Sequence, residues 1–268
     1  MNALQRVLAW LRSLLSTPGA ATGSGRTSGR PTSANGASSF HLGWELPPGS
    51  FTAASVDLEI DTPPVVTDLY FWAVQADFGD ASAETAGAHL GLQWNRRHPG
   101  ATAANWGGYH ASHLGGAILD GSASPLPSAP NDPNTRDYAW RAGTRYRLEI
   151  SPMPQRAGWW RGTITDLDAG EQTVVRDLDG GGDRIRAVTM WSEVFARCDA
   201  PSVRVRWSRL RLRTEAGAEV APLAVTVNYQ SRAAGGCDNT TAALEGATFT
   251  QTTSTRRIVA QGARLEVL

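Results

Sequence analysis

Three carboxylates alternate along one short segment of the chain. Asp57, Glu59 and Asp61 take every second position of SVDLEID, so on a strand they share one face. Retaining glycosidases need a nucleophile and a general acid about 5 Å apart, which such a run could supply. However, those enzymes show Glu-x-Asp-x-Glu, and here Pro63–Pro64 end the strand at once. We therefore interpret the run as a solvated row of like charges that discourages edge pairing, with Asp57 and Glu59 as weak catalytic candidates.

A fourth carboxylate stands in an aromatic setting. Glu193 lies in MWSEVF, between Trp191 and Phe195. Apolar surroundings raise the pKa of a carboxyl group and make it a proton donor. The alternative is an ion pair with Arg197 or Arg206, and we favour that pair while keeping Glu193 as a catalytic candidate.

Two groups of residues could hold a metal. Asp177, Asp179 and Asp183 in RDLDGGGDR are hard oxygen ligands on a glycine-rich turn, which suits Ca²⁺. Aspartate and glycine are also the ordinary residues of tight turns, and we favour plain turns. His110 and His113, with His89 upstream, have no cysteine or carboxylate at zinc-ligand spacing, so we expect hydrogen-bonding loop histidines.

The chain has two cysteines, Cys198 and Cys237. An even pair in a chain rich in Gly, Ser and Thr predicts one disulfide and an oxidising compartment. Two free, buried thiols are the alternative.

Composition limits the classes of function. Twenty-five basic residues, all arginine, balance twenty-five acidic ones, so no global field attracts nucleic acid or an acidic membrane. Ten tryptophans are spread along the 268 residues. A chain of this length can form one large β-sandwich with a sizeable core.

The first forty residues differ from the rest. Residues 1–16 carry Leu and Val at helical spacing, but Arg6 and Arg12 interrupt the apolar core that a signal peptide needs. We predict an amphipathic helix or a degenerate leader there. Residues 17–39 form a flexible Gly/Ser/Thr/Pro linker, and residues 40–268 form the folded domain. No uninterrupted apolar run reaches a membrane-spanning length.

Alternation of apolar and polar residues between Gly and Pro clusters predicts antiparallel strands throughout the domain. The predicted strands are Ser55–Asp61, Tyr70–Asp77, Ala88–Trp94, Tyr146–Ser151, Trp160–Asp166, Thr173–Asp177, Val188–Val194, Val203–Leu212, Val225–Gln230 and Arg264–Leu268. The apolar phase slips after Ser208, which predicts a β-bulge near Ser208–Arg209. The stretch Pro99–Arg136 resists assignment and contains one candidate strand, Gly107–Ser112. The predicted fold is an all-β, two-sheet jelly roll or sandwich.

Several blocks arrive in a characteristic order: YFWAVQADF, GLQWN, YAWRAGTRYRLEI, GWWRGTITDLDAGEQTVV, WSEVFARCDAPS and CDNTTA. Together they resemble a bacterial domain-of-unknown-function family of secreted proteins. The resemblance covers roughly residues 40–268 and implies a concanavalin-like β-sandwich. It brings no catalytic residues with it.

The first functional hypothesis is a non-catalytic carbohydrate-binding module that acts outside the cell or at its surface. Aromatic rings stack on sugar faces while amide and imidazole groups bind hydroxyls. The predicted ligand-binding residues are Trp94, Asn95, Trp106, Tyr109, His110 and His113. The alternatives are a glycoside hydrolase or polysaccharide lyase with an atypical carboxylate site, and a structural or protein-adhesion domain. The expected partner is a glycan, not nucleic acid, with calcium as the one cofactor considered.

Overall fold

The structure, a computed structural model, describes residues 25–110, 116–128 and 132–267. It contains sixteen strands and one short 3₁₀ turn, Pro99–Ala101. The strands are β1 (Ser38–Glu45), β2 (Phe51–Thr62), β3 (Tyr70–Gly79), β4 (Glu84–Trp94), β5 (Thr102–His110), β6 (Thr135–Asp137), β7 (Arg145–Pro152), β8 (Trp159–Asp166), β9 (Glu171–Asp179), β10 (Arg184–Val194), β11 (Arg204–Thr214), β12 (Glu219–Val220), β13 (Ala224–Tyr229), β14 (Thr241–Glu245), β15 (Thr248–Thr252) and β16 (Arg264–Glu266).

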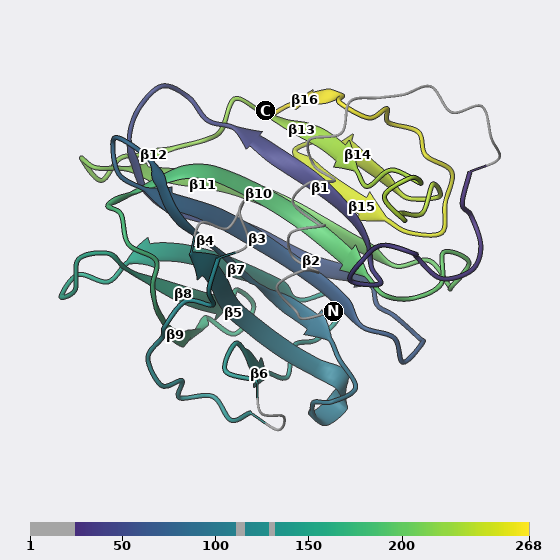
Figure 1. Cartoon of the computed structure of the whole chain (residues 1–268), viewed down its shortest axis with the longest axis horizontal. Helices are drawn as coiled ribbons and strands as arrows, with labels where there is room; N and C mark the ends of the chain where they lie inside the picture. Colours follow the sequence, from purple (N-terminus) through teal and green to yellow (C-terminus); the bar gives the residue numbers. More distant parts are fainter. Residues whose placement is uncertain (1–24, 111–115, 129–131, 268) are drawn as a thin grey trace.

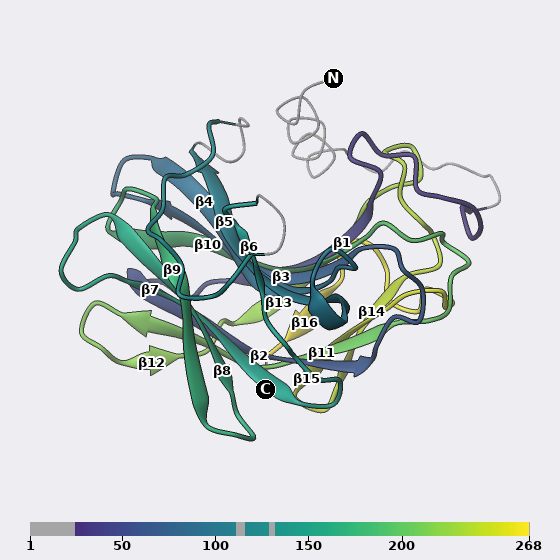
Figure 2. The ribbon, with the colours of Figure 1, turned by 90° about the horizontal axis from the view of Figure 1, so that it is seen from below.

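The strands, labelled in Figure 1, form two antiparallel layers that lie one above the other in Figure 2. The upper sheet runs β16-β13-β1-β10-β3-β4-β5-β6, and the lower sheet runs β14-β15-β11-β2-β7-β8-β9, with β12 beside β11. A single pair, Ile185 opposite Phe51, connects β10 to β2 and joins the two sheets at one corner. The all-β, sandwich-like prediction is therefore confirmed.

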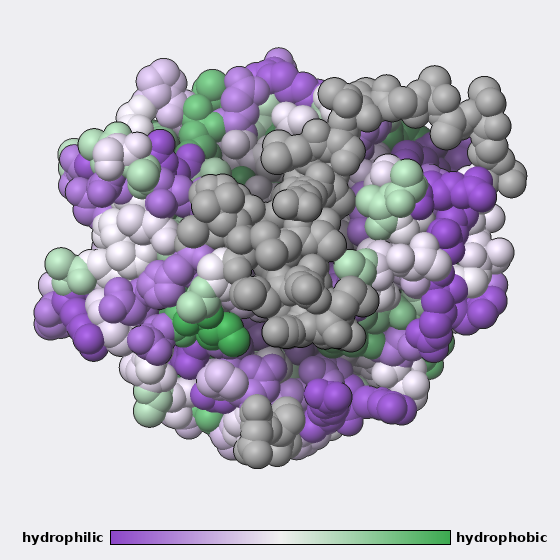
Figure 3. All heavy atoms as spheres, in the orientation of Figure 1, coloured by the Kyte–Doolittle hydropathy of each residue, from purple (hydrophilic) through white to green (hydrophobic). Residues whose placement is uncertain are grey.

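The core lies between the two sheets, because every second side chain of each strand points inward. Trp72 and Trp106 from the upper sheet meet Trp160 and Trp207 from the lower sheet, and all four are fully buried. The surface seen in the orientation of Figure 1 is mostly hydrophilic or intermediate, with apolar residues in small groups (Figure 3). Most tryptophans therefore serve packing.

The ten predicted strands correspond to β2, β3, β4, β7, β8, β9, β10, β11, β13 and β16. The predicted bulge is present: the register of β11 against β2 shifts between Ser208 and Arg211, and Arg209 has a φ of 53°. Part of Pro99–Arg136 forms β5 and β6 at the edge of the upper sheet. The predicted N-terminal helix lies outside the described residues.

Residues 25–37 fall within the predicted flexible linker but are tied to the domain. Thr32 N donates to Gly235 O, and Cys198 N donates to Gly29 O at 2.7 Å. Ala37 is fully buried, and the chain then enters β1. The polar composition predicted mobility, yet backbone groups supply these bonds whatever the side chains are.

The upper sheet is curved. In Figure 2, β4 and β5 rise on one side and β1 rises on the other. Its outer side, away from the core, is called the concave face here. Register and alternation place the following positions on it: Thr226, Asn228, Ser39, His41, Gly43, Thr189, Trp191, Glu193, Phe71, Ala73, Gln75, Asp77, Gly87, His89, Gly91, Gln93, Ala103, Asn105, Gly107 and Tyr109.

Candidate functional site

Glu193 lies on the concave face, one residue from the end of β10, a central strand of the upper sheet. On β10 it is opposite Ser39 of β1 and Phe71 of β3. Desolvation raises the pKa of its carboxyl group from 4.5 to about 7, while a hydrogen bond from Asn35 opposes the shift. The pair with Arg197 or Arg206 is not formed: Arg197 binds Asp199, and Arg206 lies 3.5 Å from Asp61. Glu193 is therefore a carboxyl group that can take and release a proton near neutral pH.

Asn35 is held against Glu193 by a tight turn. Its Nδ2 donates to Glu193 Oε1 at 2.6 Å. Its Oδ1 accepts from Ala37 N at 3.1 Å and from Ser33 Oγ at 2.9 Å, so the amide has one orientation. Gly36 closes the turn through Gly36 N to Ser33 O at 3.0 Å, with a φ of +84° that favours glycine. The turn therefore aims an N–H₂ group at the carboxyl group.

A second amide, that of Gln93, lies in the same cross-strand row as Glu193, that is, in the line of directly opposite residues on neighbouring strands. Phe71 is opposite both Glu193 and Gln93, so Gln93 lies two strands away, roughly 10 Å between Cα atoms. Gln93 Oε1 accepts a 2.9 Å bond from Asn95 Nδ2, and the side chain is almost fully buried. The curvature of the sheet tilts these side chains toward one another.

An aromatic cluster lies beside the carboxyl group. The rings of Phe71 and Trp191 meet edge to face at 4.8 Å between centroids, and His89 packs against both at 5.6 Å. Phe71 and Trp191 form an apolar cluster separate from the main core. Burial lowers the pKa of His89 and of His41 from 6.5 to about 4, so both rings are neutral at pH 7. This low-dielectric setting explains the desolvation of Glu193.

Tyr109 also belongs to the concave face. Burial raises the pKa of its hydroxyl, and the negative charge of Glu193 adds a smaller shift in the same direction. Asp132 contributes as well, but its oxygens already accept bonds from the Asn134 and Thr135 backbones and from the Thr135 hydroxyl. Tyr109 lies in the same row as Asp77, six residues along the strands from the row of Glu193.

The disulfide supports the segment that carries Asn35. Cys198 and Cys237 are bonded, which confirms that prediction. Cys198 N donates to Gly29 O, Asn239 Nδ2 donates to Thr27 O and Cys198 O, and Asp238 N donates to Arg26 O. The disulfide therefore fixes the two loops against which residues 26–32 lie.

The other predicted ligand-binding residues do not form a sugar platform. Trp106 is fully buried in the core, and Trp94 donates its Nε1–H to Val66 O at 2.7 Å while packing on Trp140. Asn95 binds Gln93, and His110 is exposed at the end of β5. His113 lies outside the described residues. No pair of exposed, coplanar rings is present among these described positions.

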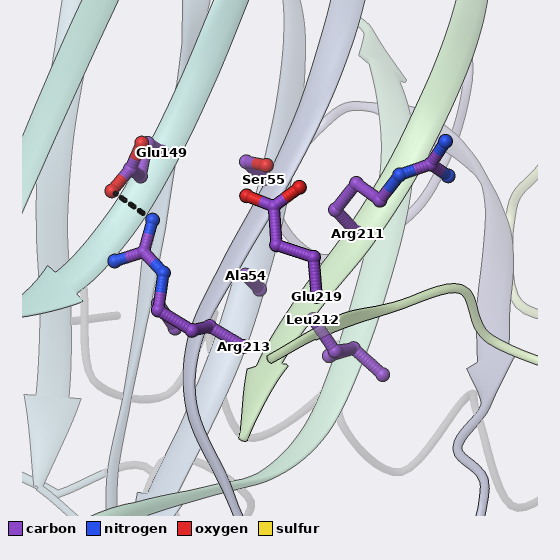
Figure 4. A pocket seen from close by; sticks show the side chains of 8 residues that line it. Ala54, Ser55, Glu149, Arg211, Leu212, Arg213 and Glu219 are labelled. Carbon is purple, nitrogen blue, oxygen red and sulfur yellow. Dashed lines mark hydrogen bonds and ion pairs between the residues drawn. The ribbon is translucent and has the colours of Figure 1, made fainter. Parts of the chain in front are cut away.

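The carboxylates of SVDLEID lie on the outer face of the lower sheet, far from Glu193. Asp57 is 1% exposed and forms a two-bond pair with Arg147, at 2.8 and 3.3 Å. Asp61 approaches Arg204 and Arg206. A hollow of about 10 Å³ on this face, large enough for one water, lies beside the Arg213–Glu149 pair (Figure 4). Arginine neighbours, not a substrate, explain this run of charges.

The three aspartates proposed for calcium are not gathered together. Asp177 binds Arg161 at 2.7 Å, and Asp183 binds Arg184 at 2.8 Å, while Asp179 stands at the end of β9. In the described ranges there is no group of three or more His, Cys, Asp or Glu side chains that could hold a metal ion. Nor does any helix in that part of the chain have the length and apolarity to cross a membrane.

The sequence analysis missed Asn35, Gln93 and His41. Asn35 was assigned to the linker, although the Asn-Gly dipeptide at Asn35–Gly36 is itself a turn signal. Gln93 and His41 alternate with the core residues Leu92 and Leu42, which would have placed them on an outer face.

Comparison with known proteins gives only distant structural likeness. No family model matches the chain, and no curated protein matches it in sequence. It is similar to a member of the eqolisin family of peptidases in a complex with the tripeptide Ala-Ile-His, with 11% identity, a TM-score of 0.45 and coverage of 80% of this chain and 97% of that one. It is also similar to scytalido-glutamic peptidase with a transition-state analogue inhibitor, with 12% identity, a TM-score of 0.46 and the same coverage. An alginate lyase gives a TM-score of 0.21 over 55% of this chain.

The prediction of a non-catalytic carbohydrate-binding module is wrong. The two tryptophans chosen to stack on sugar are packing residues instead. Likeness at these TM-scores assigns no family or activity to this chain. Its function has to be argued from its own side chains.

Proposed function

We propose that this protein is a hydrolase that cleaves an acyl bond, of the peptide class, with Glu193 as its general base and acid. One observation carries the proposal. A desolvated carboxyl group with a pKa of about 7 is held by an oriented amide donor on the concave face. A catalytic carboxyl group requires a pKa near the working pH and a fixed partner.

The proposed reaction needs only groups present on this face. Ionised Glu193 takes a proton from a water that attacks the substrate carbonyl carbon, and it then gives that proton to the leaving nitrogen. The amide of Asn35 has two N–H groups, of which one binds Glu193 Oε1 and the other can donate to the oxyanion. Gln93 supplies a second amide in the same row.

The arrangement fits glycoside hydrolysis poorly. That chemistry needs two carboxyl groups within about 10 Å of each other. The carboxylates that register and alternation place on this side of β1, β3 and β6 are all distant. Asp77 is six residues along β3 from Phe71, Glu45 is six residues along β1 from Ser39, and Asp137 of β6 is four strands away, so each lies about 20 Å from Glu193. One acid flanked by amides suits carbonyl addition, where a single proton carrier and an oxyanion donor suffice.

A uronate lyase also needs a cation to neutralise its substrate. Strand register places no arginine on this side of β1, β3, β4 or β5, and Arg264 of β16, opposite Thr226, is bound to Glu45 and Glu266. Phe71 and Trp191 next to Glu193 favour an uncharged chain with apolar side chains. The disulfide is compatible with an extracellular protein, and secretion is part of this proposal.

The test is cleavage of a mixture of unstructured peptides by the full chain, read by mass spectrometry at pH 6–8, beside a panel of polysaccharides assayed for reducing ends. We expect peptide cleavage that falls at least about 10³-fold in Glu193→Gln. The matched control is Glu59→Gln, on the outer face of the lower sheet, which should cleave as the wild type does.

A second variant distinguishes the contribution of the Asn35 amide to catalysis from that of the Glu193 carboxyl group. Asn35→Ala removes the oriented donor, and we expect kcat to fall roughly 10²-fold. Peptide cleavage that survives in Glu193→Gln contradicts the proposed function. Release of reducing ends that depends on Glu193 would assign the protein to the glycosidase class instead.

A further inference from the structure

Ser39 is the cross-strand neighbour of Glu193. The two residues face each other across β1 and β10, and Phe40 and Val194, the next residues of these strands, point into the core. The side chains of Ser39 and Glu193 therefore both project from the concave face. Directly opposed residues of an antiparallel pair have Cβ atoms about 5 Å apart.

The hydroxyl of Ser39 is buried and has no bond to a described residue. Ser39 is 3% exposed, and its Oγ has no hydrogen-bond partner. Its backbone is fully engaged, because Ser39 N donates to Gln230 Oε1 and Ser39 O accepts from Gln230 N. A buried hydroxyl without a partner costs about 1–3 kcal/mol of stability, which selection tolerates where the group has a use.

The hydroxyl of Ser39 and the carboxyl group of Glu193 are neighbours that do not bond to each other. Glu193 Oε1 is turned toward Asn35, and no hydrogen bond joins the described Ser39 hydroxyl to the Glu193 carboxyl group. Two polar groups on neighbouring Cβ atoms that do not touch are commonly bridged by a water. Serine can donate to that water or accept from it, since its O–H rotates.

Building on the proposed function, we propose that Ser39 Oγ and Glu193 together bind the attacking water. Glu193 takes the proton from this water. The hydroxyl of Ser39 orients the water so that a lone pair of the water oxygen points at the substrate carbonyl carbon. Ser39 itself forms no covalent bond to the substrate: the new bond joins water oxygen to carbonyl carbon, and the bond to the leaving nitrogen breaks as Glu193 returns the proton. Ser39 is thus a water-binding residue in the site.

The first test is kinetic and uses the full chain. Ser39→Ala should lower kcat about 100-fold with KM unchanged, because the water loses its orientation while substrate binding stays the same. Ser39→Thr, which keeps the hydroxyl, should recover most of kcat. Ser55→Ala, on the outer face of the lower sheet, is the matched control. Wild-type kcat in Ser39→Ala, with Glu193→Gln inactive, overturns the inference and leaves the proposed function standing.

A covalent acyl adduct on Ser39, trapped at low pH and located by mass spectrometry, would make it a nucleophile and also overturn the inference. The second test needs no activity. The carbon resonance of the Glu193 carboxyl group is titrated in wild type and Ser39→Ala. Loss of a bound water that solvates the carboxylate should raise its pKa by about half a unit. An unchanged titration overturns the inference even if the proposed function has failed on its own test.

Discussion

The carboxyl groups on the outer faces of the two sheets have opposite kinds of partner. On the lower sheet, Asp57 is paired with Arg147 by two bonds, and Asp177 is paired in the same manner with Arg161. On the concave face, the neutral amide of Asn35 is the hydrogen-bond partner of Glu193 among the described side chains, and burial raises the pKa of Glu193 to about 7. The lower sheet therefore pairs its carboxylates with arginine, whereas the concave face holds a desolvated carboxyl group that can exchange protons near neutrality.

Desolvation on the concave face also acts on two histidines, and there it gives the largest expected effect on stability. Burial lowers the pKa of His41 and His89 to about 4, so each folded ring binds its proton more weakly than the unfolded chain does. The contribution of these two rings to stability is therefore fully present above pH 6.5 and is lost as pH falls toward 4, by on the order of 3 kcal/mol per ring. Urea unfolding of Glu193→Gln at pH 7 and pH 4 measures the drop without the opposite contribution of Glu193.

Replacing His89 alone measures the contribution of that ring to the loss of stability in acid. His89→Phe keeps the contacts with Phe71 and Trp191 and should reduce the acid drop by about 3 kcal/mol. His110→Asn, at an exposed position, is the control and should keep the full drop. An unaltered drop in His89→Phe would mean that the concave face is wetter than its burial indicates.

On the lower sheet, Asp57→Asn should destabilise the protein by about 3 kcal/mol at pH 7, because it breaks a two-bond pair whose acidic partner is 1% exposed. Unfolding in urea checks this value. Arg209→Ala, which removes the more distant and exposed cation at 3.8 Å, is the comparison and should cost less than 1 kcal/mol.

Glu193→Gln should act in the opposite direction to Asp57→Asn. The folded pKa of Glu193 lies above its unfolded value of 4.5, so the wild type loses stability as pH rises from 4.5 to about 7. The variant should be more stable by about 2 kcal/mol at pH 8, after allowance for partial exposure, and equal to the wild type at pH 4. Chemical denaturation at both values shows it. A destabilised variant at pH 8 would remove the argument that Glu193 is held for function.

The smallest effect is expected at Arg213. Its contact with Glu149 is 3.4 Å long and partly exposed, beside the hollow of Figure 4. Arg213→Ala should change stability by no more than about 0.5 kcal/mol. Thermal unfolding in low and high salt is the measurement, and a larger loss at low salt would show that the lower face acts as a coupled network.

The strands of this fold could be predicted from the sequence, because period-two alternation records which side chains enter the core. It found ten strands and the slip at Ser208–Arg209. It placed the candidate strand at Gly107–Ser112 too late for β5, which begins at Thr102, because Gly107 and Gly108 interrupt the apolar pattern, and it missed β1, β6, β12, β14 and β15. Both alternatives for Glu193 were visible in MWSEVF, but choosing between them required knowing which arginines come near.

The partner of Glu193 was out of reach for a different reason. Asn35 lies in a segment whose composition favours disorder, and its position depends on backbone bonds to loops almost two hundred residues away. Those loops are joined by the disulfide, which the sequence did predict. The number of cysteines in the sequence predicts the disulfide. It does not predict which distant turn the disulfide supports.

The turn that carries Asn35 also bears on how this protein ages. Asn-Gly is the dipeptide most prone to lose its amide, because the backbone nitrogen of the glycine attacks the asparagine side chain. Here Gly36 N is occupied by its bond to Ser33 O, so the intact turn shields the amide from that attack. Once the turn opens, deamidation would replace the amide donor of Asn35 with a second carboxylate beside Glu193. Refolding would not restore the lost amide. Peptide mapping of stored protein would show whether residue 35 keeps its amide for as long as the turn stays closed.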